Sequence, residues 1–228
     1  MCRKKDSIPW HQNQPNEALT RNWAAVTEGR AGQRLRVLLP LCGASLDLAW
    51  LQRQGHTVVG VEGVRKAAEK LFRDADIEPE VTEMASGIIK FSSADASLTV
   101  FVTDFFNVSQ ELIGNFDAVF DRFLTKYFYT SCGYSIYRGA LEALNESDRE
   151  QYIGLIKNCL NKNFRYLLSG FEYDGSLKEG PPRPLPPGVV RELFAGVGAV
   201  TVLSQENDEG PRQRWKLPSL QRYTYLIQ

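Results

Sequence analysis

The chain has 228 residues, a length that one α/β domain can occupy while burying a large core. Its 27 lysines and arginines balance its 27 aspartates and glutamates, so no net charge attracts nucleic acid or an anionic membrane surface. No stretch approaches the ~20 apolar residues of a membrane span, and the first residues have no apolar leader behind them. We therefore expect a single cytoplasmic domain over residues 1–228, monomeric, with a small-molecule substrate and neither nucleic-acid nor membrane partners.

Residues 35–62 predict a strand, a tight turn, a helix and a second strand. Residues 35–41 form an apolar run short enough for a buried strand, whereas the apolar residues of 46–51 recur at helical spacing. Residues 57–61 give the next buried strand. Parallel strands joined by a crossover helix imply a twisted sheet with its ligand crevice at the carboxyl ends of the strands.

The remaining chain continues the alternation of helices and strands, without repeats or linkers. The elements we predict are a helix at 66–74, a hairpin of strands 88–92 and 98–103, a strand at 116–120, a helix reaching residue 161, a strand at 164–171, a helix at 189–194, and closing strands at 199–204 and 223–227. Ser147 is the predicted N-cap of the helix that reaches 161, with Glu150 completing a capping box. The prolines and glycines of 173–188 exclude regular structure and predict a stiff loop near the crevice, a candidate lid.

Two residues at one spacing suggest what the crevice binds. Gly43 lets the backbone approach a ligand at a helix N-terminus. Glu62, nineteen residues later, suits a ribose, whose two hydroxyls it can accept. A dinucleotide site would need three glycines to seat its pyrophosphate, but this turn has one. The pattern therefore favours a nucleoside without phosphates, and S-adenosylmethionine is the common one.

Asp104, Phe105 and Phe106 follow the strand at 98–103 and fit an adenine pocket. The carboxylate can accept the exocyclic amine of the base, and the rings offer apolar faces. The alternative, which the residues alone favour, is that Asp104 caps a short helical turn and that both phenylalanines belong to the core.

The sequence gives little support for a metal site or for reactive cysteines of the protein itself. The cysteines show no C-x-x-C pairing and only two histidines are present, so neither a zinc site nor a disulfide framework is expected; these residues are Cys2, Cys42, Cys132, Cys159, His11 and His56. We interpret Cys42 as a small buried group that packs the turn rather than as a reactive thiol. His56 is interpreted as a structural turn residue rather than as a base.

Several motifs in the same order resemble those of the thiopurine S-methyltransferases. Pro40-Leu41-Cys42-Gly43 and the segment 55–62 resemble the PLCG and GHxVVGVE signatures of that family. Residues 114–117 match its GxFD strand, and Asp121-Arg122 with 139–141 match the two parts of its DRGAL turn. The resemblance covers nearly the whole chain.

The resemblance implies a Rossmann-like class I methyltransferase fold, with helices on both faces of a mostly parallel seven-stranded sheet that has an antiparallel edge strand. The implied cofactor is S-adenosyl-L-methionine. Its contacts would come from Leu41, Gly43, Glu62, Asp104, Phe105 and Arg122. Trp10 matches an aromatic residue that covers the reacting centre, although alone it would more often be a staple for the following helix. Arg122 would bind the cofactor carboxylate or an anionic substrate, and its alternative is a surface arginine.

The implied reaction is attack of an aromatic or heterocyclic thiolate on the sulfonium methyl group. A thiolate is already a strong nucleophile near neutral pH, so the protein need mainly align sulfur with methyl and exclude water. We therefore assign no catalytic base and no metal. The physiological acceptor is left open.

Residues 123–138 depart from the family pattern. They separate Asp121-Arg122 from Gly139, which the family joins directly, and six of the sixteen are aromatic while none is acidic. Either Arg122 or Arg138 can take the place of the family arginine, and we favour Arg122. The chain also starts close to Trp10, so we expect part of the family's lid to be missing.

Three hypotheses remain. The first is an active S-methyltransferase. The second is a catalytically impaired cofactor-binding variant of the splice-product type. The third is an interaction protein on a degenerate methyltransferase fold, with residues 123–138 as an exposed apolar patch.

Overall fold

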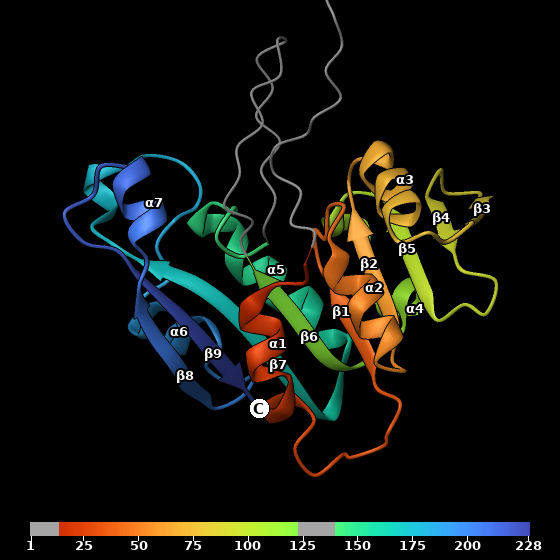
Figure 1. Ribbon diagram of the computed structural model, residues 1–228, viewed down its shortest axis with the longest axis horizontal. Helices are drawn as coiled ribbons and strands as arrows, with labels where there is room; N and C mark the ends of the chain where they lie inside the picture. Colours follow the sequence, from red (N-terminus) through yellow and green to blue (C-terminus); the bar gives the residue numbers. More distant parts are fainter. Residues whose placement is uncertain (1–13, 123–139) are drawn as a thin grey trace, which may run out of the picture.

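The computed structural model describes residues 14–122 and 140–228 (Figure 1). Their strands form one sheet in the order β3-β4-β5-β2-β1-β6-β7-β9-β8. The five central strands pair in parallel. In sheet order they are β5 (Leu98–Val102), β2 (Thr57–Glu62), β1 (Arg36–Leu39), β6 (Phe116–Arg122) and β7 (Leu160–Glu172).

The outer strands run antiparallel to their neighbours. β4 (Ile89–Ser92) pairs with β5 as the predicted hairpin, and β3 (Glu80–Glu83) pairs with β4. At the other edge, β9 (Gln221–Ile227) lies between β7 and β8 (Val200–Asn207). The described part of the sheet thus has nine strands rather than seven. β3 gave no signal in the sequence because all four of its residues are exposed and no apolar face alternates along it.

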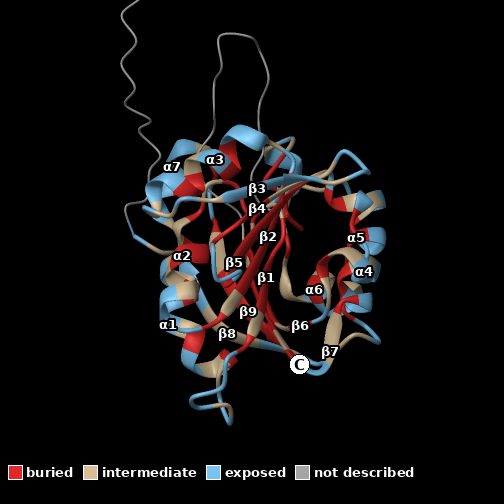
Figure 2. Cartoon of the chain, turned by 90° about the vertical axis from the view of Figure 1, so that its right-hand side faces the viewer, coloured by how far each residue is buried: buried red, intermediate tan, exposed pale blue. Residues whose placement is uncertain are grey.

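Helices cover both faces of the sheet, as predicted. One face carries α1 (Glu17–Val26), α2 (Leu46–Arg53) and α3 (Arg65–Asp74); the other carries α4 (Gln110–Ile113), α5 (Glu146–Asn158) and α6 (Pro187–Leu193). The strands alternate between the two cores: Val37 and Leu39 pack toward α1 and α2, whereas Leu38 packs toward α5. Figure 2 shows the strands buried between helices whose outer faces are exposed.

The helices differ from the prediction in several details. α5 ends at Asn158 rather than at residue 161, because the chain already enters β7 at Leu160. α5 begins after Asn145 and has no side-chain cap bond, so Ser147 is not its N-cap; the Ser147 hydroxyl donates to Asp148 instead. α1 was not predicted, although Asn16 caps it by accepting the Ala18 N–H at 2.8 Å.

The proline-rich segment 173–188 is largely irregular, as predicted, apart from a turn of 3-10 helix, η2 (Gly175–Leu177), and the start of α6 at Pro187. The Lys178 ammonium donates to the carbonyl oxygens of Gly180, Pro181 and Pro182 at 3.0–3.3 Å. The α7 helix (Glu209–Arg214) lies beside this segment, since Lys178 is 5.1 Å from the ring centre of Trp215, which ends that helix. The segment is thus fixed to α7.

Gly60 lets α2 pack closely on β2. A methyl group at Gly60 would lie 2.7 Å from Cys42 Sγ and 2.8 Å from Leu48 Cδ2, whereas one at Gly63 would meet nothing within 4 Å. We predict that Gly60→Ala lowers the free energy of unfolding by ~1–3 kcal/mol through overpacking. Gly63→Ala is the matched control and should change it by less than ~0.5 kcal/mol. Urea denaturation measures both, and equal values for the two variants would contradict this packing argument.

Candidate functional site at the carboxyl edge of the sheet

The central strands end at one edge of the sheet. From β1 the chain builds β2 and β5 on one side and then returns to build β6 and β7 on the other. The junction of β1 and β6 is therefore the point where strand order reverses, which is where open α/β sheets bind their ligands. The turn 40–45 follows β1 at this point and leads into α2.

Glu62 and Gly43, which the sequence paired by spacing, are in direct contact. Glu62 Oε2 accepts the Gly43 N–H at 2.7 Å, and Oε1 accepts the Val64 N–H at 2.9 Å. Glu62 is only 5% exposed. Two backbone bonds therefore fix the carboxylate against the glycine turn. A carboxylate can accept about four hydrogen bonds, so these two bonds are compatible with additional donors from a ribose.

The turn has an unusual backbone. Gly43 has a φ of 58°, and Leu41 has a φ of 45°, in the left-handed region that leucine rarely adopts. Strain of this kind persists only where the surroundings enforce it, and it is common at ligand sites. Here the Cys42 N–H donates to the Val61 carbonyl at 3.0 Å and extends the pairing of β1 with β2 into the turn.

Asp104 lies at the strand end next to Glu62, because the Thr103 N–H donates to the Glu62 carbonyl at 3.0 Å. Asp104 is exposed, and its Oδ1 caps the 3-10 turn η1 (Phe105–Asn107) by accepting the Phe106 N–H at 3.0 Å. The Phe105 ring is 2% exposed and packs in the core against Tyr152, with ring centres 4.9 Å apart. The capping role considered from sequence is present, and the Phe105 ring lies in the core.

Arg122 ends β6 and is held by a buried network. Its Nε donates to Asp47 Oδ2 at 2.6 Å and its second guanidinium nitrogen to Ser45 Oγ at 2.9 Å. The Arg122 side chain is 8% exposed and that of Asp47 is 1% exposed, so Arg122 is not a surface arginine. Arg122, Asp47 and Ser45 line a small hollow with Leu41 and Phe120.

Sequence reasoning missed Asp47. The available signal was Ser45-Leu46-Asp47 at the helix start, where Ser45 caps α2 and Asp47 lies in its first turn.

Asp121 joins the two ends of the chain that flank residues 123–139. Its Oδ2 accepts the hydroxyl groups of Tyr152 at 2.8 Å and Tyr166 at 2.7 Å, and its Oδ1 lies 3.5 Å from the Leu141 nitrogen. Burial raises the pKa of the Asp121 carboxyl above its ordinary value. Arg122 and Ala140 are therefore near each other in space. Trp10 and Arg138 lie outside the described residues.

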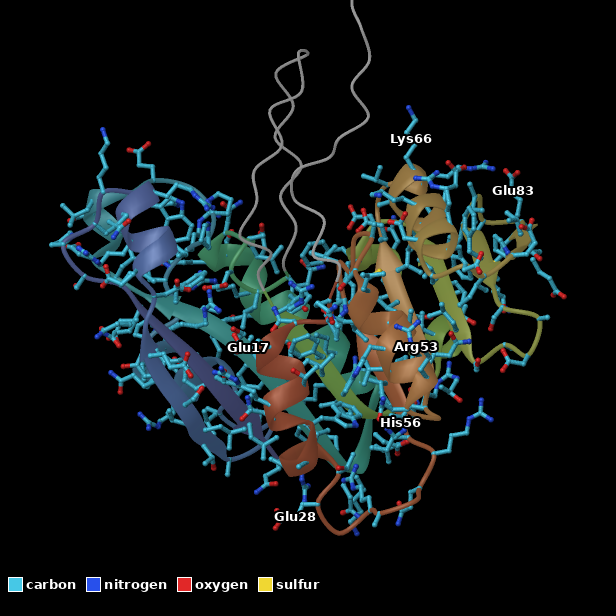
Figure 3. The ribbon with its side chains drawn as sticks, in the orientation of Figure 1. Glu17, Glu28, Arg53, His56, Lys66 and Glu83 are labelled. Atoms are coloured by element: carbon cyan, nitrogen blue, oxygen red, sulfur yellow. The ribbon has the colours of Figure 1, made fainter. Side chains whose placement is uncertain are left out.

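His56 lies at the opposite edge of the sheet, immediately before β2 begins, and Figure 3 shows it far from Lys66 at the start of α3. Its Nε2 faces the Trp23 indole N–H at 3.2 Å, and its Nδ1 faces the Leu35 N–H at 3.3 Å. His56 is 7% exposed, which fits the structural role predicted for it. Among the described residues, no three of His, Cys, Asp and Glu cluster as metal ligands would.

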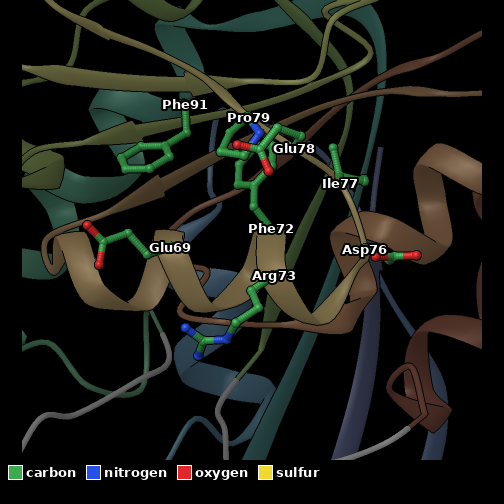
Figure 4. Close-up of a pocket in the computed structure, with 8 residues that line it drawn as sticks. All are labelled: Glu69, Phe72, Arg73, Asp76, Ile77, Glu78, Pro79 and Phe91. Atoms are coloured by element: carbon green, nitrogen blue, oxygen red, sulfur yellow. The ribbon is translucent and has the colours of Figure 1, made fainter.

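A separate hollow lies along the second half of α3 and the segment after it (Figure 4). Its walls include Phe72 and Phe91, two core rings whose centres are 6.0 Å apart. None of its lining residues comes from the loops that follow β1, β2 or β6. The candidate site therefore stays at the switch point.

Comparison with known proteins identifies the family. A family model described as Thiopurine S-methyltransferase (TPMT) matches residues 1–125 and 130–228. The chain belongs to the thiopurine S-methyltransferase family. A thiopurine S-methyltransferase of Teredinibacter turnerae is 36% identical over 194 residues, 84% of this chain and 78% of the relative. The Mus musculus enzyme is 29% identical over 224 residues, 96% of this chain and 85% of the relative.

Solved structures show the same fold. A 1,6-didemethyltoxoflavin-N1-methyltransferase of Burkholderia thailandensis, solved with S-adenosylhomocysteine, gives a TM-score of 0.55 at 17% identity over 92% of this chain and 78% of that chain. Magnesium protoporphyrin IX methyltransferase of Synechocystis gives 0.56 at 13% identity over 92% and 81%. The methyltransferase fold expected from sequence is confirmed, and thiopurine S-methyltransferases use S-adenosylmethionine. No helix within 14–122 or 140–228 is long and apolar enough to cross a membrane.

His56 gives the fold a testable pH dependence. Burial lowers its pKa below the ordinary value of 6.5. Protonation would also turn the one acceptor nitrogen of the neutral ring into a second donor, although an N–H group faces each ring nitrogen. The unfolded chain binds the proton near pH 6.5, while the folded chain binds it only at lower pH. We predict that the contribution of neutral His56 to the free energy of unfolding is fully present above pH 6.5. It is lost as the pH falls from 6.5 through the lower pKa of the folded state.

Urea titrations from pH 5 to pH 8 test this, with His56→Gln as the comparison. The variant should have a lower free energy of unfolding overall, and the slope of that free energy against pH should lose the contribution of His56. An unchanged slope in His56→Gln would contradict the assignment.

Proposed function

We propose that this protein transfers the methyl group of S-adenosylmethionine to the sulfur of aromatic or heterocyclic thiols of the thiopurine type. The observation that supports it most is the Glu62–Gly43 bond of 2.7 Å at the switch point of a methyltransferase sheet. Family membership supplies the reaction class. Bound cofactor supplies an electrophilic sulfonium methyl group, and the chain's own residues supply orientation and exclusion of water.

The residues at the carboxyl edge suit a nucleoside without phosphates. Glu62 presents a carboxylate already oriented by two backbone bonds, so little side-chain freedom is lost when it accepts ribose hydroxyls. Gly43 and Leu41 would hold the adjoining part of the cofactor along the strained turn. Only Oδ1 of Asp104 takes part in its cap, so the second oxygen suits the amine of adenine.

Arg122 and the hollow beside it serve the sulfur end. Arg122 keeps its guanidinium at the end of β6, where the N–H groups outside the Asp47 and Ser45 bonds can donate to the cofactor carboxylate or to an anionic acceptor. The Phe120 ring lies under the guanidinium, with its centre 6.0 Å from Arg122 Cζ, and gives the hollow an apolar wall. Trp10 is proposed as a cover over the acceptor. The thiolate needs no base because it is already nucleophilic near neutral pH.

We predict transfer of label from methyl-labelled S-adenosylmethionine to thiophenol and mercaptopurine, with none to phenol or aniline of matched shape. Cofactor binding by calorimetry without transfer to any thiol would select the impaired variant instead. Absence of cofactor heat, with self-association that depends on residues 123–138, would select the interaction protein.

Deleting residues 123–138 tests whether they affect methyl transfer. We expect a chain lacking residues 123–138 to fold, because the Asp121 carboxylate already brings Leu141 beside the end of β6. Thermal denaturation should give a similar midpoint for both chains, and both should transfer label to thiols. Activity in the shortened chain alone would show that the insert disables the enzyme.

A further inference from the structure

Asp47 is the centre of the buried network at the switch point. Its Oδ2 accepts Arg122 Nε and the Ser45 hydroxyl at 2.6 and 2.7 Å, and its Oδ1 accepts the Asn16 N–H at 2.6 Å. These partners come from β6, the turn before α2 and the residue that caps α1. One carboxylate therefore holds three separate segments together.

The position of Asp47 is itself fixed. Its own N–H donates to Ser45 Oγ at 3.2 Å, which closes the cap of α2, and Ser45 Oγ in turn accepts from Arg122 at 2.9 Å. Asp47 is 1% exposed and Ser45 is 6% exposed, so water screens neither group well. Arg122 is consequently held in one orientation by Asp47 and Ser45, which line the same hollow as its own side chain.

Asp47 also cancels a charge. Arg122 is permanently cationic. Because Asp47 Oδ2 lies 2.6 Å from Arg122 Nε and the two side chains are only 1% and 8% exposed, the hollow is lined by a neutral pair instead of a unit positive charge. An acceptor placed beside the hollow would therefore meet hydrogen-bond donors without a strong field that selects for anions.

We propose that Asp47 is a positioning residue that fixes Arg122 and sets the charge selectivity of the methyl acceptor, keeping the site open to aromatic thiols that carry no anionic group besides the reacting thiolate. This inference rests on the proposed function, because it concerns the acceptor of that same site. It adds a residue that acts through Arg122, by holding its guanidinium and balancing its charge.

The test compares two acceptors of similar shape and different charge, mercaptobenzoate and methylthiophenol. In the full chain saturated with S-adenosylhomocysteine, calorimetry measures the affinity for each. Replacing Asp47 by Asn removes the counter-charge while keeping the side-chain volume. We expect Asp47→Asn to raise the preference for mercaptobenzoate over methylthiophenol by about tenfold, as expected when a nearby cation loses its partner. In turnover the change should appear in KM rather than in kcat, and Asp47→Glu should restore the preference of the unmodified chain.

The controls separate this role from a structural one. Asp117→Asn makes the same chemical change at a carboxylate on the opposite edge of the sheet, where it accepts the Arg36 N–H at 2.8 Å, and it should leave the preference unchanged. Thermal denaturation identifies any loss of fold. If Asp47→Asn weakens the binding of both acceptors in proportion, or raises the preference for methylthiophenol, the inference is overturned. If the unmodified chain binds the acceptors but transfers no label, the proposed function is overturned. The ratio of the affinities for the two acceptors then still tests the role of Asp47.

Discussion

The bond between the Glu62 carboxylate and the Gly43 N–H is the constraint on which the site depends. It joins the end of β2 to the turn after β1, and the second carboxylate oxygen holds the backbone of Val64. Glycine alone would leave this turn with wide conformational freedom. The same carboxylate is buried and directed at the turn, so one side chain fixes the crevice at the place where we propose that the ribose binds.

Two other charged residues at this edge, Arg122 and Asp121, have their partners within the protein. Arg122 is neutralised by Asp47, and Asp121 is buried against two tyrosine hydroxyls. Such buried groups are costly when one partner is removed, so they hold the loops after β1 and β6 in fixed positions. This arrangement suits a reaction that requires alignment of sulfur and methyl more than acid–base chemistry.

The sequence predicted the parts of the fold that depend on local patterns. Buried strands read as apolar runs, and the pairing of Gly43 with Glu62 followed from the geometry of any βαβ unit. It could not predict β3, which has no buried face, or the partners of Arg122, because residues 47 and 122 are brought together only by the sheet order. Phe105 is a case that the sequence left open, because an aromatic residue after a strand fits a ligand pocket or the core equally well. Only its packing against Tyr152 places the ring in the core.

Calorimetry of S-adenosylhomocysteine with the Glu62→Gln variant tests most directly whether the Glu62 carboxylate binds the ribose of the cofactor. Bonds to a charged acceptor contribute ~1.5–3 kcal/mol each, so the account predicts at least a ~10-fold loss of affinity in a variant whose circular dichroism shows an intact fold. Undiminished affinity in that folded variant would contradict it.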